Sequence, residues 1–211
     1  MGRFRDALTG RHVMVDGETL SLGGSCVFTQ LAALEFWPDD PGRECRIWSR
    51  YIDLSDSMRL GRQLDAHTIL WWMDDRGAGP EARQALVRGL RDDRNPPLSW
   101  REALEELASF LIGPVGRGLG AKPAGLAGVW SHGAAFDVSR LETAYRDLRI
   151  GVPFSHREVL DTRTLFRLAG RELSELCPHA ENGLVLHDAR ADVEAQATAV
   201  QAALMIIDGE E

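Results

Sequence analysis

The stretch that decides the fold reads His12-Val13-Met14-Val15-Asp16-Gly17-Glu18-Thr19. Its first half is apolar and β-branched, which predicts a strand, and the run ends in acid. Because side chains alternate along a strand, Asp16 and Glu18 point to the same face, where two carboxylates repel unless a cation or a proton lies between them. A divalent metal is the economical explanation, and a solvated strand end or turn is the alternative for a lone Asp-x-Glu.

Two more strands are expected directly after this segment. Residues 26–37 form an apolar run after Gly23-Gly24, and residues 44–52 alternate in polarity after a turn cluster at residues 38–42. Turn residues between such runs are typical of antiparallel neighbours. The opening of the chain therefore predicts an antiparallel meander of three strands.

Helices are expected after the meander. Asp65 caps a short helix, and Pro80 suits the first turn of a second one. Ser99-Trp100-Arg101-Glu102 is a capping-box pattern, and the apolar residues that follow it at helical spacing are Trp100, Leu104, Leu107 and Leu111. This segment predicts an amphipathic helix.

The second half of the chain is expected to alternate strand and helix. Residues 113–128 are rich in Gly and Pro and predict a long connection, because neither flank could build a core alone. Residues 126–131 predict a buried strand, and helices are predicted at residues 136–148, 161–168 and 189–207. The expected fold is one α/β domain over residues 1–211, with a mixed sheet flanked by helices.

Composition limits the class of protein. The 211 residues are 44% hydrophobic, and 32 acidic residues outnumber 24 basic ones for a net charge of −8. These values fit a globular domain, exclude disordered and fibrous classes, and argue against a basic coat protein for nucleic acid, although a local basic groove stays open. Three cysteines without a disulfide framework indicate a reducing compartment, and the absence of a signal core or long apolar run predicts a soluble, cytoplasmic protein with no membrane contact.

Three further ionisable residues lie in contexts that suit a site. Asp137 follows a strand that runs through small residues into a helix, so its carboxylate is expected at the sheet edge; a charge that stabilises a helix dipole is the alternative. His187 precedes the last helix and Asp192 lies in its first turn, so both can face one pocket; a capping aspartate beside a surface histidine is the alternative. Carboxylates suit hard cations such as magnesium or manganese.

Taken in order, these motifs resemble a known family. Asp16-Gly17-Glu18-Thr19, Phe136-Asp137 and the stretch from His187 to Asp192 resemble the three exonuclease motifs of the DEDDh branch of the DnaQ-like 3′–5′ exonuclease superfamily. Residues 67–72, 130–133 and 161–164 are similar to segments of the small phage and mycobacterial-type exoribonuclease subfamily, and the resemblance runs from about residue 12 to residue 200. It implies a ribonuclease-H-like fold, with an antiparallel three-stranded meander plus parallel strands, flanked by helices.

The resemblance also implies catalytic roles. Two Mg²⁺ or Mn²⁺ ions would clamp the scissile phosphate, held by the metal ligands Asp16, Glu18, Asp137 and Asp192. His187 would be the general base that takes a proton from the attacking water, a task that its pKa near neutrality suits. These five residues are the expected catalytic set, with Asp161-Thr162 supporting the site.

Substrate contacts are expected from strand-end and aromatic residues. By the resemblance, Thr19 and Leu20 would contact the 3′-terminal nucleotide. The full expected substrate-binding set is Thr19, Leu20, Trp72, His132 and Phe136, and His132 stands where relatives often carry asparagine. Aromatic rings can stack on bases, and the sequence leaves open which of Trp71 and Trp72 points inward.

The expected activity is a metal-dependent 3′–5′ exonuclease that hydrolyses phosphodiester bonds at the 3′ end of RNA or single-stranded DNA and releases nucleoside 5′-monophosphates. An inactive nucleic-acid-binding protein of the same fold and a hydrolase of very short oligonucleotides are the alternatives. A zinc site built from Cys177, His179 and His187 is weakened by the lack of a fourth spaced ligand. The expected partners are RNA or DNA 3′ ends and, because small members of the branch are often homodimers, a second copy of the chain.

Overall fold

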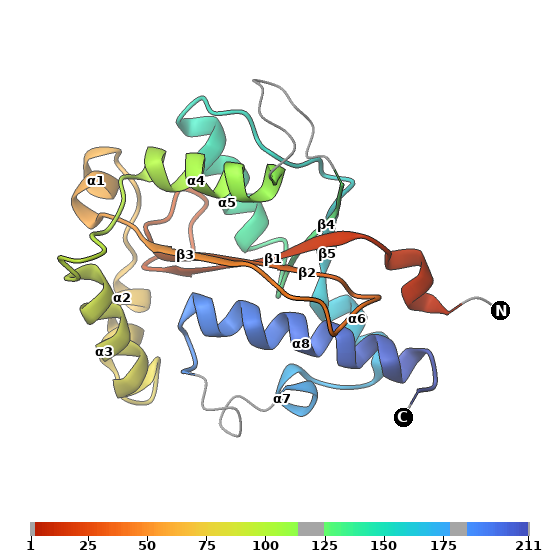
Figure 1. Ribbon diagram of the computed structural model, residues 1–211. Helices are drawn as coiled ribbons and strands as arrows, with labels where there is room; N and C mark the ends of the chain where they lie inside the picture. Colours follow the sequence, from red (N-terminus) through yellow and green to blue (C-terminus); the bar gives the residue numbers. More distant parts are fainter. Residues whose placement is uncertain (1–2, 114–124, 178–184, 211) are drawn as a thin grey trace.

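A five-stranded sheet forms the centre of the protein, with helices on both of its faces (Figure 1). The structure, a computed structural model, describes residues 3–113, 125–177 and 185–210. In the spatial order β3-β2-β1-β4-β5, the strands are β1 (Arg11–Thr19), β2 (Phe28–Phe36), β3 (Ile47–Tyr51), β4 (Leu126–Ser131) and β5 (Val159–Asp161). The first three form an antiparallel meander, whereas β4 is parallel to β1 and β5 is parallel to β4. The predicted mixed α/β sheet is confirmed.

The sequence analysis missed one strand of this sheet. β5 has only three residues, too few to display an alternating pattern, and it pairs with β4 from Val129↔Val159 to Ser131↔Asp161. The helix predicted at residues 161–168 follows it directly. Asp161 ends β5 and also caps that helix, because its side chain accepts hydrogen bonds from the backbone N–H groups of Arg163 and Thr164.

Helices cover the sheet on two sides. The helical segments are η1 (Phe4–Leu8, a 3-10 helix), α1 (Leu54–Arg59), α2 (Ala66–Met73), α3 (Gly79–Leu90), α4 (Trp100–Ile112), α5 (Asp137–Asp147), α6 (Thr162–Ala169), α7 (Leu173–Leu176) and α8 (Ala189–Ile207). α4 and α5 lie over one face, and α8 lies across the other with α6 and α7 beside it (Figure 1). The bounds predicted for the last helix are confirmed by α8, whereas the short helices η1, α1 and α7 were not predicted.

Alternation along β1 divides the buried core between the two faces. Val13 and Val15 belong to the cluster that contains Trp100 of α4, and Met14 belongs to the cluster that contains Val193 of α8. Since the period of a strand is two, the even-numbered acids of β1 continue the Met14 side and point toward α8. The core thus determines which helix faces the candidate site.

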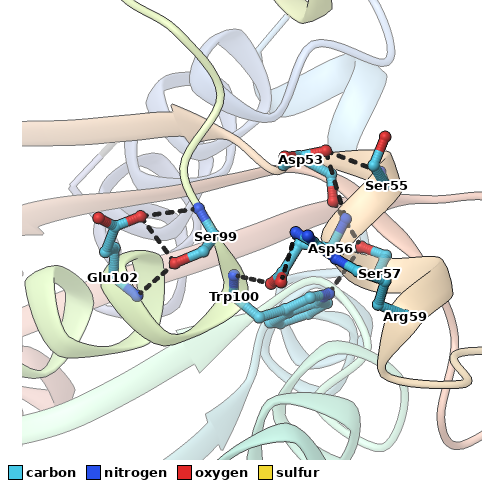
Figure 2. A network of polar contacts seen from close by, with 8 residues as sticks. All are labelled: Asp53, Ser55, Asp56, Ser57, Arg59, Ser99, Trp100 and Glu102. Carbon is cyan, nitrogen blue, oxygen red and sulfur yellow. Dashed lines mark hydrogen bonds and ion pairs between the residues drawn. The ribbon is translucent and has the colours of Figure 1, made fainter.

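Figure 2 shows how local polar contacts lock α1 to the start of α4. The predicted capping box is confirmed, because the hydroxyl of Ser99 accepts from the backbone N–H of Glu102 while the Glu102 carboxylate accepts from the Ser99 backbone. The Asp56 carboxylate accepts from the Trp100 backbone N–H at 2.9 Å, and Ser57 Oγ accepts from the Trp100 indole at 2.8 Å. Trp100, which is fully buried, is therefore held through both its backbone N–H and its indole N–H.

Two other expectations, on the long connection and on membrane contact, are tested only in part. Most of the connection predicted at residues 113–128 lies outside the described residues, and from Leu126 onward it belongs to β4. Within the described ranges, no helix has the length and apolar character needed to cross a membrane. In the described part of the chain, Cys26, Cys45 and Cys177 form no disulfide.

Candidate active site

The four predicted carboxylates line one cavity where β1 and β4 end. Asp16 and Glu18 lie in the second half of β1, Asp137 is the first residue of α5, and Asp192 lies in the first turn of α8. Because β1 and β4 are parallel, their carboxyl ends lie at the same edge of the sheet. The cavity has a volume of about 360 Å³, and its walls also include His132, Phe136, Arg163, His187 and Gln196.

The glycine between the two acids of β1 is required by packing on the opposite face. A Cβ built on Gly17 would lie 2.3 Å from the ring of Phe28, which is fully buried under α4. No side chain larger than hydrogen fits there without moving Phe28. The Asp-Gly-Glu segment therefore presents both carboxylates to the cavity while it keeps the core closed behind them.

His187 comes to the carboxylates from the turn that precedes α8. Its backbone has a φ of 58°, and the next residue, Asp188, caps the helix by accepting from the N–H groups of Arg190 and Ala191. Ligand atoms of Glu18, His187 and Asp192 all lie within 4.8 Å of one another, so these three form a possible metal-binding group. The strained turn fixes the imidazole beside two of the four carboxylates.

Burial shapes the charge of the cluster. Burial, together with repulsion from the carboxylate of Asp16, raises the pKa of Asp137 to about 8 and the pKa of Asp192 to about 8. Burial and repulsion from the Asp188 carboxylate raise the pKa of Asp16 to about 6, and burial with its acidic neighbours raises the pKa of Glu18 well above its usual range. The group holds its negative charge poorly unless cations or protons compensate it.

Neighbouring polar groups orient the carboxylates. Ser131 Oγ donates to Asp137 Oδ2 at 2.6 Å, and Gln196 Nε2 donates to Asp16 Oδ1 at 2.9 Å. The sequence analysis missed Gln196, although its position one turn after Asp192 on α8 was a usable signal. Its Oε1 is a buried acceptor without a hydrogen-bond partner among the described residues.

Asp161 and Thr162 hold the turn between β4 and α5, as expected of a supporting element. Asp161 Oδ2 accepts from the backbone N–H of Ala134 at 2.7 Å, and Thr162 Oγ1 lies 2.8 Å from His132 Nδ1. These contacts join the start of α6 to the segment that carries Asp137. His132 thereby reaches the cavity wall, but its contact with substrate stays a prediction.

A second cavity of about 450 Å³ adjoins the first and shares Gly17, Glu18 and Phe136 with it. Its other walls are Thr19, Leu22, Asp65, His67, Thr68, Trp71 and Trp72. Three of the expected substrate-binding residues, Thr19, Trp72 and Phe136, thus lie at this cavity. Leu20 does not, because its side chain lines a separate apolar cavity with Val27 and Leu86.

The structure distinguishes the two adjacent tryptophans. Trp72 is only 4% exposed, and its indole donates to the backbone carbonyl of Thr19 at 2.9 Å. Trp71 is 39% exposed, and its ring meets His187 edge to face with centroids 4.8 Å apart. Trp72 is therefore the core member of the pair, and substrate contact stays a prediction for its cavity-facing edge.

The zinc alternative falls partly outside the described residues. Cys177 is buried against α8, whereas His179 lies in the undescribed range 178–184. The acids that do gather offer hard oxygen donors, which suit magnesium or manganese better than the softer donors of the proposed zinc set do.

Solved structures with the same fold are nucleases. The exonuclease I of E. coli, in complex with a 5cy-dA13 oligonucleotide, is similar with a TM-score of 0.56 and 16% identity over 93% of this chain and 40% of that one. The exonuclease I from Methylocaldum szegediense has a TM-score of 0.56 and 17% identity over 93% and 40%. Cell-death related nuclease 4 (CRN-4) has a TM-score of 0.56 and 15% identity over 92% and 63%. At these identities the likeness shows the fold, and the chain spans less than two thirds of each of these proteins.

Sequence comparison identifies the family. No curated protein matches the chain significantly. A family model described as "3'-5' exoribonuclease Rv2179c-like domain" matches residues 11–204, which include β1, the residues that line the cavity and most of α8. The chain therefore belongs to the Rv2179c-like 3′–5′ exoribonuclease domain family, with the ribonuclease-H-like fold of the DnaQ-like nucleases.

Proposed function

We propose that this protein removes nucleotides one at a time from the 3′ end of RNA or single-stranded DNA, with divalent metal ions, and releases nucleoside 5′-monophosphates. The observation that carries the proposal is the cavity at the end of β1, where Asp16, Glu18, Asp137 and Asp192 lie with His187. Its chemistry agrees with the family to which the domain belongs. The described residues form one sheet with its helices, and we propose a single domain over residues 1–211.

The donor set fits magnesium or manganese. The four acids offer only carboxylate oxygens, which these hard cations prefer, and their raised pKa values mark negative charge that burial disfavours. Two bound ions would supply charge stabilisation at the attacking and leaving oxygens of the scissile phosphate. Asp16, Glu18, Asp137 and Asp192 are the residues proposed to hold them.

His187 is proposed to accept a proton from the water that attacks the terminal phosphorus. The bond that breaks joins this phosphorus to the 3′ oxygen of the penultimate nucleotide, so the phosphate leaves with the terminal nucleoside. The φ of 58° and the edge contact with Trp71 hold the His187 imidazole at the cavity, as a positioned base requires.

The adjoining cavity is proposed to receive the terminal nucleotide. Its volume of about 450 Å³ lies within the usual range for small-ligand sites, and Trp71 and Phe136 give it aromatic walls. Base stacking on such rings tolerates every base, which suits an exonuclease without sequence preference. This cavity lies beside the carboxylates because Glu18 lines both cavities, and Thr19 at the end of β1 lines it as well.

Two further points belong to the same proposal. A cytoplasmic location agrees with three cysteines that form no disulfide among the described residues, as suits a reducing compartment. A homodimer is the proposed assembly, and light scattering of the purified protein measures it directly.

Matched strands test the proposed function. RNA and DNA of one sequence, single-stranded or duplex and labelled at the 3′ or the 5′ end, are incubated with Mg²⁺, Mn²⁺ or EDTA. We expect early release of the 3′ label as a 5′-monophosphate, a ladder from the 5′-labelled strand, and no reaction in EDTA. Binding without cleavage would favour an inactive nucleic-acid-binding protein, and cleavage of dinucleotides alone would favour a hydrolase of short oligonucleotides.

A further inference from the structure

A small hollow on the surface of α6 adjoins the catalytic cavity and shares no lining residue with the cavity that contains Trp71. It has a volume of about 110 Å³ and is lined by His132, Arg163, Phe166, Arg167, Arg171 and Glu172, which we call the α6 hollow. The α6 hollow shares His132 and Arg163 with the catalytic cavity. The proposed nucleotide cavity shares Gly17, Glu18 and Phe136 with the catalytic cavity instead. The three spaces therefore form a series with the carboxylates in the middle.

The charge of the α6 hollow is opposite to that of the catalytic cluster. Arg163 and Arg167 lie one turn apart on the exposed side of α6. Neither guanidinium has an ion pair or a side-chain hydrogen bond within residues 3–113, 125–177 and 185–210. Glu172, the acid in the wall, already accepts from the backbone at the start of α7. Two arginines are thus free to bind an anion at this place.

The position of Arg163 depends on a glycine in the β4–α5 turn. Gly133 has a φ of +107°, and a Cβ built on it would lie 3.1 Å from Arg163 Nη1 and 3.2 Å from Cζ. The guanidinium therefore lies against the bare backbone of this turn, in the wall of the catalytic cavity. Glycine supplies both the backbone conformation and the space.

Size and neighbourhood select the kind of anion. The hollow exceeds the roughly 10–15 Å³ that one water needs, yet it is much smaller than the cavity proposed for a nucleotide, so a phosphate group fits and a nucleoside does not. A strand whose terminal phosphodiester lies at Asp16 and Asp137 carries its next phosphate one nucleotide toward the 5′ end. The α6 hollow is a positively charged surface that adjoins the catalytic cavity and shares no wall with the proposed nucleotide cavity.

The geometry points to a subsite in which Arg163 and Arg167 bind the backbone phosphate one nucleotide 5′ of the scissile linkage. This inference rests on the proposed function, and it adds that efficient cleavage requires the 5′ phosphate of the penultimate nucleotide. Arginine forks bind phosphate oxygens in pairs, so the contact would also fix the direction in which the strand enters. The sequence of the strand would not matter to it, because a phosphate carries no base identity.

A single neutral linkage tests the subsite. The substrate is a 3′-labelled strand in which the linkage next to the terminal one is a methylphosphonate, compared with the unmodified strand and with a strand neutralised five linkages upstream. We expect the adjacent neutral linkage to lower kcat/KM for release of the first nucleotide by about 10- to 100-fold, and the distant one to have little effect.

Variants complete the test. Arg163→Gln combined with Arg167→Gln should lower kcat/KM on the unmodified strand by a similar factor and should abolish the difference between the two strands. Arg157→Gln is the control, because this exposed arginine precedes β5 and lies at the opposite end of that strand from the site. Thermal melts of all variants confirm folding, since both α6 arginines are exposed.

The outcomes separate the two proposals. If the native protein releases nothing from the unmodified strand, the proposed function fails. If it releases the label but the adjacent neutral linkage has no effect, or if the double variant still distinguishes the strands, the subsite is wrong. A loss in Arg157→Gln as large as that in the double variant would show a general charge effect and would also overturn the subsite.

Discussion

Carboxylate oxygens of Glu18 in β1 and Asp192 in α8 lie within 4.8 Å of each other. Burial and repulsion from the carboxylates of Asp16 and Asp192 raise the pKa of Glu18 well above its usual range, which favours a bound proton there. The same place can be taken by a divalent cation, which binds both groups ionised. The proposed metal ions would therefore compete with protons for this site.

The first prediction concerns stability without metal. The pKa of Asp137 is raised to about 8 in the folded protein, against about 4 in the unfolded chain, so between these values the folded state binds more protons. The free energy of unfolding contributed by Asp137 therefore falls as the pH rises from 4 to 8. Melting in EDTA should show that Asp137→Asn stabilises the protein more at pH 8 than at pH 5.

This comparison isolates the cluster from other groups. Burial lowers the pKa of His12 and of His132, which makes stability rise with pH and acts in the opposite direction, but both histidines are present in either protein. A stabilisation by Asp137→Asn that does not grow between pH 5 and pH 8 would contradict the prediction.

The second prediction is that Asp16→Asn or Asp137→Asn lowers hydrolysis by at least about 100-fold and leaves the fold intact. The amide keeps the shape of the side chain but removes charge that the metal ions need. Glu142→Gln is the matched control, because Glu142 is a half-buried acid of α5 that pairs with Arg146, and this variant should keep full activity. Activity of either aspartate variant in the native range, or activity in EDTA, would disprove metal-dependent catalysis by this cluster.

The third prediction concerns His187. His187→Asn should lower turnover by about 10²–10⁴-fold, the usual contribution of a positioned base. Asparagine is chosen because it tolerates the left-handed φ of 58° better than alanine, so the turn into α8 is preserved. Calorimetric titration with Mn²⁺ should show metal binding unchanged. Loss of binding would make His187 a ligand, a role that its position within 4.8 Å of two acids allows.

The fourth prediction separates Trp71 from Trp72. Trp72→Ala removes a buried ring and its hydrogen bond to Thr19, so it should destabilise the protein by about 3–5 kcal/mol. Trp71→Ala should melt near the native temperature but bind a single strand more weakly, by roughly the 1–3 kcal/mol that stacking contributes. Melting curves and anisotropy titrations measure the two effects. Equal destabilisation with unchanged affinity would place both rings in a structural role.

The fifth prediction is that Gly17→Ala destabilises the protein by about 1–3 kcal/mol or more, although the position lies between two candidate catalytic acids. The added Cβ would lie 2.3 Å from the Phe28 ring, in the core under α4. Urea unfolding gives the loss, and the double variant Gly17→Ala with Phe28→Leu should recover part of it. A stable Gly17→Ala protein would show that Phe28 moves at little cost.

Local signals in the chain were sufficient for most elements. Asp65 accepts from the N–H groups of His67 and Thr68, as predicted for the cap of α2, and Pro80 lies in the first turn of α3. The capping box and α8 are likewise as predicted, because caps and helical periodicity involve residues only a few positions apart. β5 could not be predicted because its three residues show no pattern of their own. It is a strand only because it pairs with β4.

The sequence by itself determined that Asp16 and Glu18 share one face of a strand and that His187 and Asp192 flank the start of a helix, since strand alternation and helix geometry are local. Only the tertiary structure decided that Glu18 meets Asp192, that Trp72 is core while Trp71 is exposed, and that Arg163 lies against Gly133. These relationships join segments far apart in the chain. They arise from burying both faces of the sheet, and no local pattern encodes which distant side chains that burial brings together.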